Sequence, residues 1–490
     1  MSSRVAFIAA ECEPWAKTGG LADVVDALAR ALGECGPGAI DGLADVYLPR
    51  YRGIDVPMDA AAHRLRVSDP TAPDGVTGLR IVDVVARGYR LRLVDHPAAF
   101  DRAGYYGEGA DYPDNAWRFG LLCRAAIEAA RSDPRPPDIL HLHDWHAAPA
   151  LLFRDGADRR DPVLARTATL LTIHNLAYHG WTPADRLAEL GIAARSPLAG
   201  TNPDGLDLLG AAIDRADLVN TVSPGFAAEA LAPEGGMDLD GRLRARGDRF
   251  FGILNGLDTD LWDPATDAAL AAPYSRADPG GKAACRTALL GELGLDPGDP
   301  GPVLAMIGRL DPQKGFDLLA EAAPALLARG IRLAVLGTGH PELLATLARV
   351  AARRPGRIAI VERFDRDLAR RMYAGADGFL MPSRFEPCGT GQMIALRYGT
   401  PPIVRSTGGL RDTVIDTTTK PRSGTGFRFE AAAPEALVEA CERFLRLFEA
   451  GGQGWSALLD RGMAVDFDWR RSSAPAYVRA YERAIAIRRF

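Results

Sequence analysis

Lysine is scarce in this chain. Of its 58 basic residues only four are lysines, at positions 17, 282, 314 and 420, and arginine supplies the rest. A lysine retained against such a bias is expected to be needed as a compact ammonium, which a planar guanidinium does not replace. Lys17 and Lys314 lie in glycine-containing loops, which supports a binding role for both. The 63 acidic residues bring the net charge to −5, so the chain has no overall attraction to nucleic acid.

Other absences narrow the class of protein. No run of about 20 apolar residues is present, which excludes an integral membrane protein. The six cysteines form no CxxC pair, which favours reduced thiols over disulfides or a zinc site. Glu11 and Glu13 interrupt the apolar N-terminal stretch, so we interpret it as a first strand and not a signal peptide, and expect a cytoplasmic protein. Neither GxGxxG nor GxxxxGK[ST] marks its glycine loops, which disfavours a Rossmann oxidoreductase.

What the sequence does contain is two successive series of alternating strand and helix patterns. The first predicts strands at 5–9, 139–142, 169–173, 218–222 and 251–254, with helices at 21–32 and 117–130. The second predicts strands at 303–307, 333–336, 358–361, 378–381 and 402–404, with helices at 316–328, 341–352, 366–373, 392–398 and 434–448. Such alternation indicates α/β domains with doubly wound parallel sheets.

The expected organisation is a first domain over residues 1–256, a Pro/Asp/Ala-rich linker over 257–281 and a second domain over 282–474. The motif TGGLxD occurs in both series, at 18–23 and 407–412, each time between a predicted strand and a predicted helix. Two similar halves of this kind suggest two facing Rossmann-like domains with a deep ligand cleft between them. In the first copy, Lys17 beside Gly19 and Gly20 favours phosphate or sugar oxygens, although an ordinary tight turn is the alternative.

Two loops of the second domain carry charges suited to a phosphorylated ligand. Arg309 and Lys314 follow the strand at 303–307 and suit a diphosphate, the alternative being a solvated charged loop. Glu386 precedes the amides of residues 389–391, which can bind an anion while the carboxylate binds sugar hydroxyls. Here the alternative is an exposed loop carboxylate. For Cys388 we expect a packing role and not a nucleophile.

Five of the eight histidines lie within 39 residues, at positions 141, 143, 146, 174 and 179. The run HLHDWH at 141–146 differs from the HxHxDH pattern of binuclear hydrolases because its aspartate is displaced, so we predict no metal site. Asp144 and His174 follow neighbouring predicted strands and are expected to bind a carbohydrate by hydrogen bonds. His141, within a strand, is expected to be a core residue.

Together these motifs resemble the bacterial glycogen synthases and plant starch synthases, which are retaining glucosyltransferases of the GT-B fold. The resemblance covers nearly the whole chain. Its motifs are KTGGLADV at 17–24, DYPDN at 111–115, HDWHA at 143–147, TIHNLAYHG at 172–180, NGLD at 255–258, GRLDPQKG at 308–315, SRFEPCG at 383–389 and TGGLRDTV at 407–414. Eight motifs in the family's order are highly specific. The resemblance also implies that a terminal helix over 475–490 returns to the first domain.

Carried over motif by motif, the resemblance implies two groups of site residues. The residues implied to act on the transfer itself are Glu386, His174, Asp144, Lys314 and Arg309. Those implied to bind substrate are Lys17, Gly19, Gly20, Asp23, Tyr106, Asn175, Asn255, Phe364, Cys388, Gly389 and Thr390. Within the second group Phe364 would stack on adenine. The chain departs from the family pattern at Gly391 and Ile394, where threonine and tyrosine are usual.

The implied reaction is transfer of glucose from ADP-glucose to the non-reducing 4-hydroxyl of an α-1,4-glucan, with retention and without metal or cofactor. No carboxylate nucleophile is evident on the reactive face, so same-face attack, with the leaving diphosphate accepting the proton, is expected. No nucleic acid or membrane partner is expected. Two alternatives stay open. One is another retaining GT-B transferase that uses UDP-glucose or a different acceptor, and the other is a catalytically weak glucan-binding relative.

Overall fold

A computed structural model describes residues 3–35, 40–193, 196–199 and 202–489. The chain forms two compact units. Unit 1 contains the chain up to Val222, then Ala227–Gly256, and returns from Trp469 onward. Unit 2 contains Ser223–Phe226 and Leu257–Asp468. No helix in the described ranges is long and apolar enough to cross a membrane.

Unit 1 is built on a nine-stranded sheet in the order β11-β10-β7-β6-β1-β2-β5-β4-β3. Its strands are β1 (Val5–Ile8), β2 (Ala44–Pro49), β3 (Ala62–Ser68), β4 (Val76–Ala86), β5 (Tyr89–Asp95), β6 (Ile139–His143), β7 (Ala168–Ile173), β10 (Leu218–Thr221) and β11 (Phe250–Gly252). All neighbouring strands pair in parallel except β4, which is antiparallel to β3 and β5. A separate small sheet pairs β8 (Trp181–Pro183) with β9 (Gly205–Asp207).

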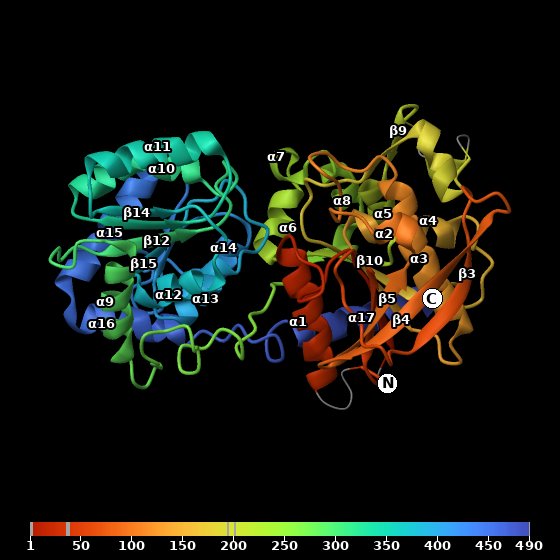
Figure 1. Ribbon diagram of the computed structural model, residues 1–490, viewed down its shortest axis with the longest axis horizontal. Helices are drawn as coiled ribbons and strands as arrows, with labels where there is room; N and C mark the ends of the chain where they lie inside the picture. The colour runs from red at the N-terminus through yellow and green to blue at the C-terminus, as the bar shows by residue number, and fades with distance from the viewer. Residues whose placement is uncertain (1–2, 36–39, 194–195, 200–201, 490) are drawn as a thin grey trace. The chain divides into compact units, whose positions relative to one another are not determined.

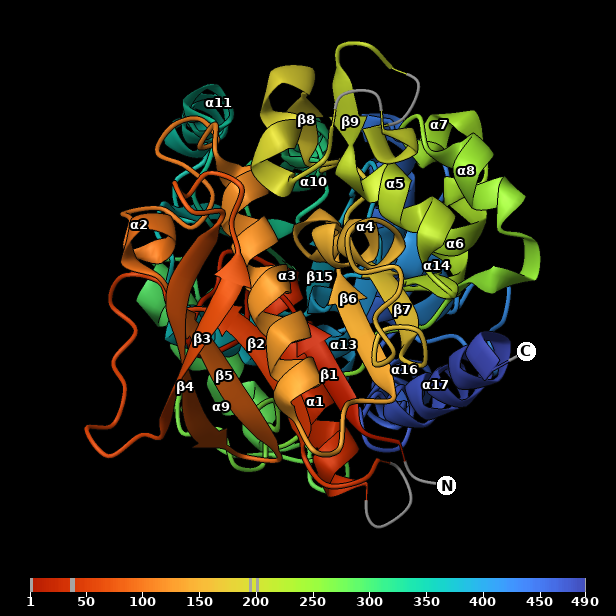
Figure 2. The ribbon, with the colours of Figure 1, turned by 90° about the vertical axis from the view of Figure 1, so that its right-hand side faces the viewer.

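Helices cover the large sheet of unit 1, as Figure 2 shows for α3 and α17. The longer ones are α1 (Gly20–Glu34), α3 (Asn115–Ser132), α5 (Leu208–Arg215) and α17 (Ala474–Arg489). Shorter helices are α2 (Pro97–Phe100), α4 (Pro149–Asp155), α6 (Pro224–Ala230), α7 (Pro233–Gly236) and α8 (Asp240–Ala245). Helix α1 buries the apolar stripe that includes Val24, Val25, Leu28 and Leu32.

Unit 2 is built on a six-stranded, fully parallel sheet in the order β14-β13-β12-β15-β16-β17. The strands are β12 (Val303–Ile307), β13 (Arg332–Leu336), β14 (Ile358–Val361), β15 (Gly378–Met381), β16 (Pro402–Arg405) and β17 (Phe427–Phe429). Helices lie on both sides of the sheet, with α10 and α11 on one side and α12 and α13 on the other (Figure 1). The helices are α9 (Gly281–Leu293), α10 (Phe316–Ala328), α11 (Pro341–Arg353), α12 (Arg366–Gly375), α13 (Gly391–Arg397), α14 (Gly408–Thr413), α15 (Pro434–Ala450) and α16 (Gly452–Met463).

In each sheet the strand order reverses at one point, and this point positions the functional loops. In unit 1 β1 is followed by β2 on one side, whereas β6 is followed by β7, β10 and β11 on the other. In unit 2 the same reversal separates β12 from β15. Loops that leave the carboxyl ends of two such strands diverge and leave a crevice, where ligands bind in open α/β sheets. Ligand-binding residues are therefore expected in the loops after β1 and β6 of unit 1 and in those after β12 and β15 of unit 2.

The unit boundaries differ from those expected from the sequence. The segment 257–281, expected to be a linker, packs within unit 2. Its Asp267 accepts hydrogen bonds from the Tyr398 hydroxyl at 2.5 Å and from Arg370 at 3.0 Å, and its Tyr274 donates to the Tyr398 carbonyl at 2.8 Å. The return to unit 1 begins at Trp469, whose ring lies against Gly256, and not at residue 475.

Candidate active site

The centre of the unit 2 site is a contact between Lys314, from the loop after β12, and Glu386, from the loop after β15. Lys314 Nζ lies 2.6 Å from Glu386 Oε2, and Ser383 donates to the same oxygen at 3.2 Å. Glu386 is only 5% exposed. Gly315 permits the two loops to meet, since its φ is +77° and a Cβ there would lie 2.2 Å from the Pro382 carbonyl oxygen.

Arg309 lies on the same loop with its guanidinium exposed. It contacts Asp311 at 3.4 Å and Gln313 at 3.3 Å. The two loops are also joined through their backbones, because Arg384 N donates to the Gln313 carbonyl at 2.8 Å. The structure thus brings Lys314 and Glu386 into direct contact and leaves the charge of Arg309 accessible beside them.

The backbone after Glu386 is held in a tight turn that requires glycine. Gly389 has φ +73°, and a Cβ there would lie 2.6 Å from Gln392 Oε1. Buried Gln392 donates to the carbonyls of Cys388 and Gly389 at 3.1 and 2.9 Å, which fixes the turn. Cys388 is buried, whereas Thr390 is exposed at the start of α13. Sequence reasoning missed Ser383 and Gln392, which carry no motif of their own.

The second TGG motif supports this turn from behind. Gly409 N donates to the Glu386 carbonyl at 3.1 Å. A Cβ on Gly408 would lie 2.1 Å from the same carbonyl oxygen, and one on Gly409 would lie 2.3 Å from that of Cys388. The two glycines therefore allow the backbones to touch.

Two further residues of unit 2 were noted in the sequence: Gly391, where the family usually has threonine, and Phe364, which would stack on adenine. A Cβ on Gly391 would lie 3.0 Å from the ring of Phe379 and 3.2 Å from the hydroxyl of Tyr373, so these side chains occupy the room that a larger residue would need. Phe364 follows β14 and is 80% exposed, so its ring face is open to a planar ligand.

In unit 1 the glycine-rich loop after β1 is organised by Glu11, which sequence reasoning did not include in the site. Its buried carboxylate accepts hydrogen bonds from Thr18 N at 2.6 Å, the Thr18 hydroxyl at 2.5 Å and Gly19 N at 3.1 Å. A fourth comes from the Tyr106 hydroxyl at 2.5 Å. The backbone amides of Thr18 and Gly19 are therefore already paired with Glu11.

Lys17 and Asp23 are brought together at the edge of the same loop. Lys17 Nζ lies 2.5 Å from Asp23 Oδ1 and 3.3 Å from Glu13 Oε2, and all three side chains are partly exposed. Tyr106, which Glu11 holds, stacks on the ring of His146 with centroids 4.9 Å apart. The partly exposed groups at the edge of the first TGG loop thus include the side chains of Lys17 and Asp23.

Asp144 and His174 meet at the carboxyl ends of β6 and β7, as expected for neighbouring parallel strands. Asp144 Oδ1 accepts a hydrogen bond from His174 N at 2.7 Å. Burial raises the pKa of Asp144 to about 7, although hydrogen bonds from the backbone amides of His174 and Asn175 oppose the rise. Burial also lowers the pKa of His174 to about 3, so its imidazole is neutral at physiological pH.

Two asparagines complete the polar groups expected in unit 1. Asn175 Oδ1 accepts from Ala177 N at 3.0 Å, which shapes the turn after β7. Asn255 is buried, and its Oδ1 has no hydrogen-bond partner among the described residues. A buried acceptor of this kind is unfavourable unless a ligand or water donates to it, so Asn255 is suited to a ligand hydroxyl.

The three histidines of the HLHDWH run are all buried. His141 is buried and hydrogen-bonded on both ring nitrogens, to Thr172 at 2.7 Å and to Tyr481 at 2.9 Å. His143 contacts His174 and His146 stacks on Tyr106. Within the described ranges no group of three or more histidine, cysteine, aspartate or glutamate residues is placed to hold a metal ion.

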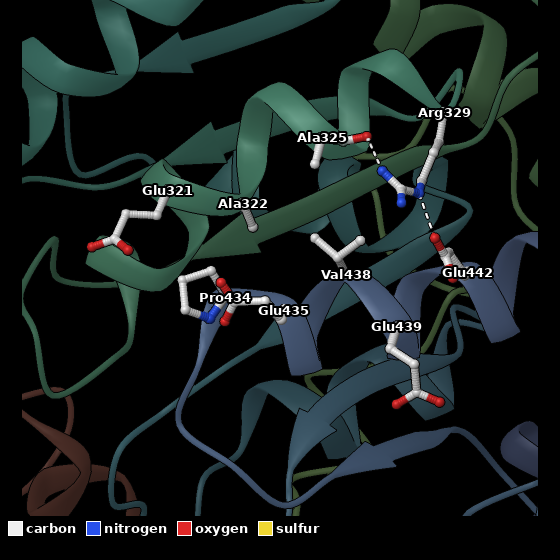
Figure 3. A pocket seen from close by; sticks show the side chains of 9 residues that line it. All are labelled: Glu321, Ala322, Ala325, Arg329, Pro434, Glu435, Val438, Glu439 and Glu442. Carbon is white, nitrogen blue, oxygen red and sulfur yellow. Dashed lines mark hydrogen bonds and ion pairs between the residues drawn. The ribbon is translucent and has the colours of Figure 1, made fainter.

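A groove of about 370 Å³ lies elsewhere in unit 2, between α10 and α15 (Figure 3). Four glutamates line it, at positions 321, 435, 439 and 442. Its one lining cation, Arg329, already contacts Glu442 and the Ala325 carbonyl. An acidic groove repels phosphate, and none of the site residues described above lines it, so we do not assign it to the active site.

Two family models match the chain. The model of the starch synthase catalytic domain matches residues 4–245, and the model of glycosyl transferases group 1 matches residues 301–446. A glycogen synthase of Anaeromyxobacter sp. (strain Fw109-5) is 46% identical over 483 residues, which is 97% of this chain and 98% of that protein. A glycogen synthase of Syntrophotalea carbinolica (strain DSM 2380 / NBRC 103641 / GraBd1) is 41% identical over 488 residues, 99% of each. The chain belongs to the glycogen and starch synthase family.

Comparison with solved structures supports the same family assignment. The catalytic domain of starch synthase IV from Arabidopsis thaliana, bound to ADP and acarbose, matches this synthase with a TM-score of 0.87 at 33% identity, covering 99% of this chain and 100% of that one. Sucrose-phosphate synthase from Thermosynechococcus elongatus, at 20% identity and a TM-score of 0.60 over 99% of each chain, shares the fold. The expected family and the GT-B glycosyltransferase fold are confirmed, with a mainly parallel α/β sheet in unit 1 and a fully parallel one in unit 2.

Proposed function

We propose that this synthase transfers glucose from ADP-glucose to the non-reducing 4-hydroxyl of an α-1,4-glucan and so elongates glycogen. The glycogen synthases of similar sequence and the ADP bound to starch synthase IV support this choice of substrates. Within this chain the proposal depends on the contact of Lys314 with Glu386 at the strand-order reversal of unit 2, with Arg309 exposed beside it.

The donor groups belong to unit 2. Arg309 and Lys314 supply two positive charges for the diphosphate, and Glu386, already held by Lys314 and Ser383, accepts hydrogen bonds from glucose hydroxyls. The amides of the turn after Glu386 and the exposed Thr390 add donors for the phosphate. The open ring of Phe364 offers a stacking surface for adenine.

The transfer then breaks the bond between glucose C1 and the diphosphate oxygen and forms a bond from C1 to the acceptor oxygen on the same face. The acceptor proton passes to the leaving diphosphate. Because negative charge develops on that diphosphate, fixed cations beside it lower the barrier more than they strengthen substrate binding. Arg309 and Lys314 are the groups that supply this stabilisation.

Unit 1 supplies uncharged hydrogen-bonding groups suited to sugar hydroxyls. Neutral His174, Asn175 and the unpartnered oxygen of Asn255 can each bind a hydroxyl, and Asp144 can accept a hydrogen bond when it is ionised. Lys17 and Asp23 are proposed to bind at the edge of the same site. A cytoplasmic location is supported by the six cysteines, none of which forms a disulfide among the described residues.

The first test compares turnover of ADP-glucose and UDP-glucose on a glycogen primer. We expect ADP-glucose to be used with the higher kcat/KM and the glycan to lengthen. Higher kcat/KM with UDP-glucose would instead identify another retaining GT-B transferase, and glucan binding without turnover of either donor would identify a non-catalytic relative.

A lysine series tests the assignment of the diphosphate site. We expect Lys314→Ala to lower kcat by about 10²–10³-fold, because the developing charge loses a fixed cation, with a smaller effect on glucan binding. Lys314→Arg is expected to be poor as well, since a planar fork does not fit the position of a point charge. Lys420, another of the four lysines and exposed on unit 2, provides the control, and Lys420→Ala should behave as wild type. A fully active Lys314→Arg variant would contradict the proposal.

A further inference from the structure

A buried histidine pair lies at the end of β6, and the proposed function so far uses only one of its members. His143 is fully buried, and its Nδ1 lies 3.0 Å from Nε2 of His174. The other ring nitrogen of His143, Nε2, is buried with no hydrogen-bond partner among the described residues. His174 is partly exposed, and among the described residues no partner contacts its Nδ1.

The neighbouring His141 has no hydrogen-bonding capacity left for this pair. Asn220 Nδ2 donates to the Thr221 carbonyl at 3.3 Å, so Asn220 Oδ1 is the acceptor that faces Thr172 at 2.7 Å. The Thr172 hydroxyl gives its one proton to Asn220 and therefore accepts from His141 Nε2–H at 2.7 Å. His141 Nδ1 is then bare and accepts from the Tyr481 hydroxyl at 2.9 Å.

Two arrangements of the His143–His174 contact remain, and they leave different atoms unsatisfied. Burial lowers the pKa of both rings, so each is neutral and carries one proton. If His174 Nε2 were the donor, His143 would carry its proton on Nε2 and bury an N–H group without an acceptor. If His143 Nδ1 is the donor, only a bare acceptor is left at Nε2. Orphaned buried N–H groups are rarer in proteins than under-satisfied acceptors.

We propose that His143 is a positioning residue that donates through Nδ1–H to His174 Nε2 and so holds His174 in the tautomer with its proton on Nδ1. Asp144, which accepts from the His174 amide at 2.7 Å, fixes the backbone of the same residue. His174 then presents a neutral N–H donor, oriented in advance, to an oxygen of the sugar. This inference rests on the proposed function of His174 as a sugar-binding residue.

The tautomer is directly measurable. In protein labelled with ¹⁵N-histidine, the chemical shifts of the ring nitrogens distinguish a protonated from a bare nitrogen, and loss of one set in His174→Ala assigns the signals. We expect His174 to carry its proton on Nδ1 at neutral pH. A proton on Nε2 of His174 would overturn the proposal, whatever the enzyme's activity.

Substitutions test the functional consequence. Asparagine places its amide N–H close to the position of imidazole Nδ1, so His143→Asn should retain kcat within about threefold. His143→Leu removes the donor and should lower kcat by about tenfold, the effect of one neutral hydrogen bond, while the KM for ADP-glucose stays unchanged. The spectrum of His143→Leu should show both tautomers of His174.

Tyr481→Phe is the matched structural control, because it removes a hydrogen bond from His141 in the same buried network and leaves the His143–His174 contact intact. It should lower stability yet keep the tautomer and kcat. If His143→Leu and Tyr481→Phe lost kcat equally at equal stability, or if His143→Leu kept full kcat, the positioning role would be overturned. A wild-type protein inactive with ADP-glucose would refute the proposed function instead, and the tautomer measurement would still decide this inference.

Discussion

A carboxylate of the protein itself fills the anion-binding position of the first glycine-rich loop. Glu11 accepts hydrogen bonds from two backbone amides and two hydroxyls, and such donors compensate a buried carboxylate for its lost hydration. The sequence did not reveal this role, because the partners lie seven, eight and 95 residues away and a lone glutamate after a strand has no pattern. Asp144 and His174 were predictable, because adjacent parallel strands place them together.

Removal of that carboxylate should loosen the loop. Glu11→Ala leaves Thr18 N, Gly19 N and the Tyr106 hydroxyl without their acceptor, which we expect to cost about 2–3 kcal/mol of unfolding free energy. Urea unfolding measures the change. Glu13→Ala is the control, since the ion pair of Glu13 with Lys17 is partly exposed and its loss should cost less than about 1 kcal/mol. Equal losses in the two variants would contradict the assigned role of Glu11.

The raised pKa of Asp144 predicts a pH dependence of stability with a definite sign. The unfolded carboxyl has a pKa near 4 and the folded one about 7, so the folded state binds the proton more tightly and its stability falls as pH rises from about 4 to 7. The full effect is at most about 4 kcal/mol. Asp144→Asn removes it with a side chain of nearly the same shape and no ionisable group.

Urea unfolding of wild type and Asp144→Asn at pH 5, 6, 7 and 8 isolates this contribution, because all other titrating groups are common to both proteins. The variant should gain stability relative to wild type as pH rises and level off near pH 8. A difference that is constant across this range would show that the carboxyl does not titrate there.

At the scale of elements, the two TGG motifs show that one sequence pattern can serve two physical purposes. In unit 1 a Cβ built on Gly19 or Gly20 would meet no heavy atom of the described residues within 4 Å, its own chain neighbours and helix backbone apart, and the loop is organised by Glu11. In unit 2 the corresponding Gly408 and Gly409 touch the backbone of the Glu386 turn, and Gly408 has φ +43°. The repeat correctly predicted two similar strand-to-helix loops, but the packing partners of each loop come from distant parts of the chain.

Alanine substitutions distinguish the open glycine loop of unit 1 from the close backbone contact made by the glycines of unit 2. Gly409→Ala should displace the Glu386 turn, because its Cβ would lie 2.3 Å from the Cys388 carbonyl oxygen, and we expect kcat to fall by more than about tenfold. Gly20→Ala is the matched control at the equivalent motif position. It should leave the unfolding free energy within about 0.5 kcal/mol of wild type or raise it slightly, since alanine is the better helix former. Wild-type kcat in Gly409→Ala would contradict the supporting role of the second motif.

Strands were predictable where an uninterrupted apolar run marks them. All ten strands expected from apolar runs are present, with ends shifted by at most two residues. The missed β3 and β4 lie at the edge of the sheet, where arginines face solvent and break the apolar pattern. In β2 the run is interrupted by Asp45, which pairs with Arg90. The expected terminal helix is α17, and Phe490, its expected last residue, lies outside the described residues.

At the scale of the whole molecule, the chain crosses from unit 1 to unit 2 and back. Composition did not indicate the residues at which these crossings occur. Residues 257–281 look like a linker because they lack periodicity, yet irregular backbone can pack tightly when buried side chains such as Asp267 and Tyr274 find partners. Those partners, on α12 and α13, are more than 90 residues away, so no local pattern identifies them. The division into two α/β units, in contrast, followed directly from the restart of the alternating pattern.

Each unit has its own sheet and its own buried polar contacts. A substitution that destabilises one unit should therefore leave the unfolding free energy of the other nearly unchanged. In unit 1, Tyr481→Phe leaves His141 Nδ1 without a donor and should cost about 1–2 kcal/mol. In unit 2, Lys282 donates to the carbonyls of Ala374 and Tyr398 and to the Thr400 hydroxyl at 2.7–3.1 Å. Lys282→Met removes all three bonds and should cost about 2–3 kcal/mol.

Calorimetry of the two single variants and the double variant tests this independence. We expect two unfolding transitions, with Tyr481→Phe lowering the Tm of one by about 2–8 °C and Lys282→Met lowering that of the other by about 4–12 °C, given about 2–4 °C per kcal/mol for units of this size. The double variant should show both shifts unchanged in size, because distant substitutions without shared partners are additive. If either substitution lowered both transitions equally, the two units would unfold as one cooperative structure and their separate sheets would not be separate units of stability.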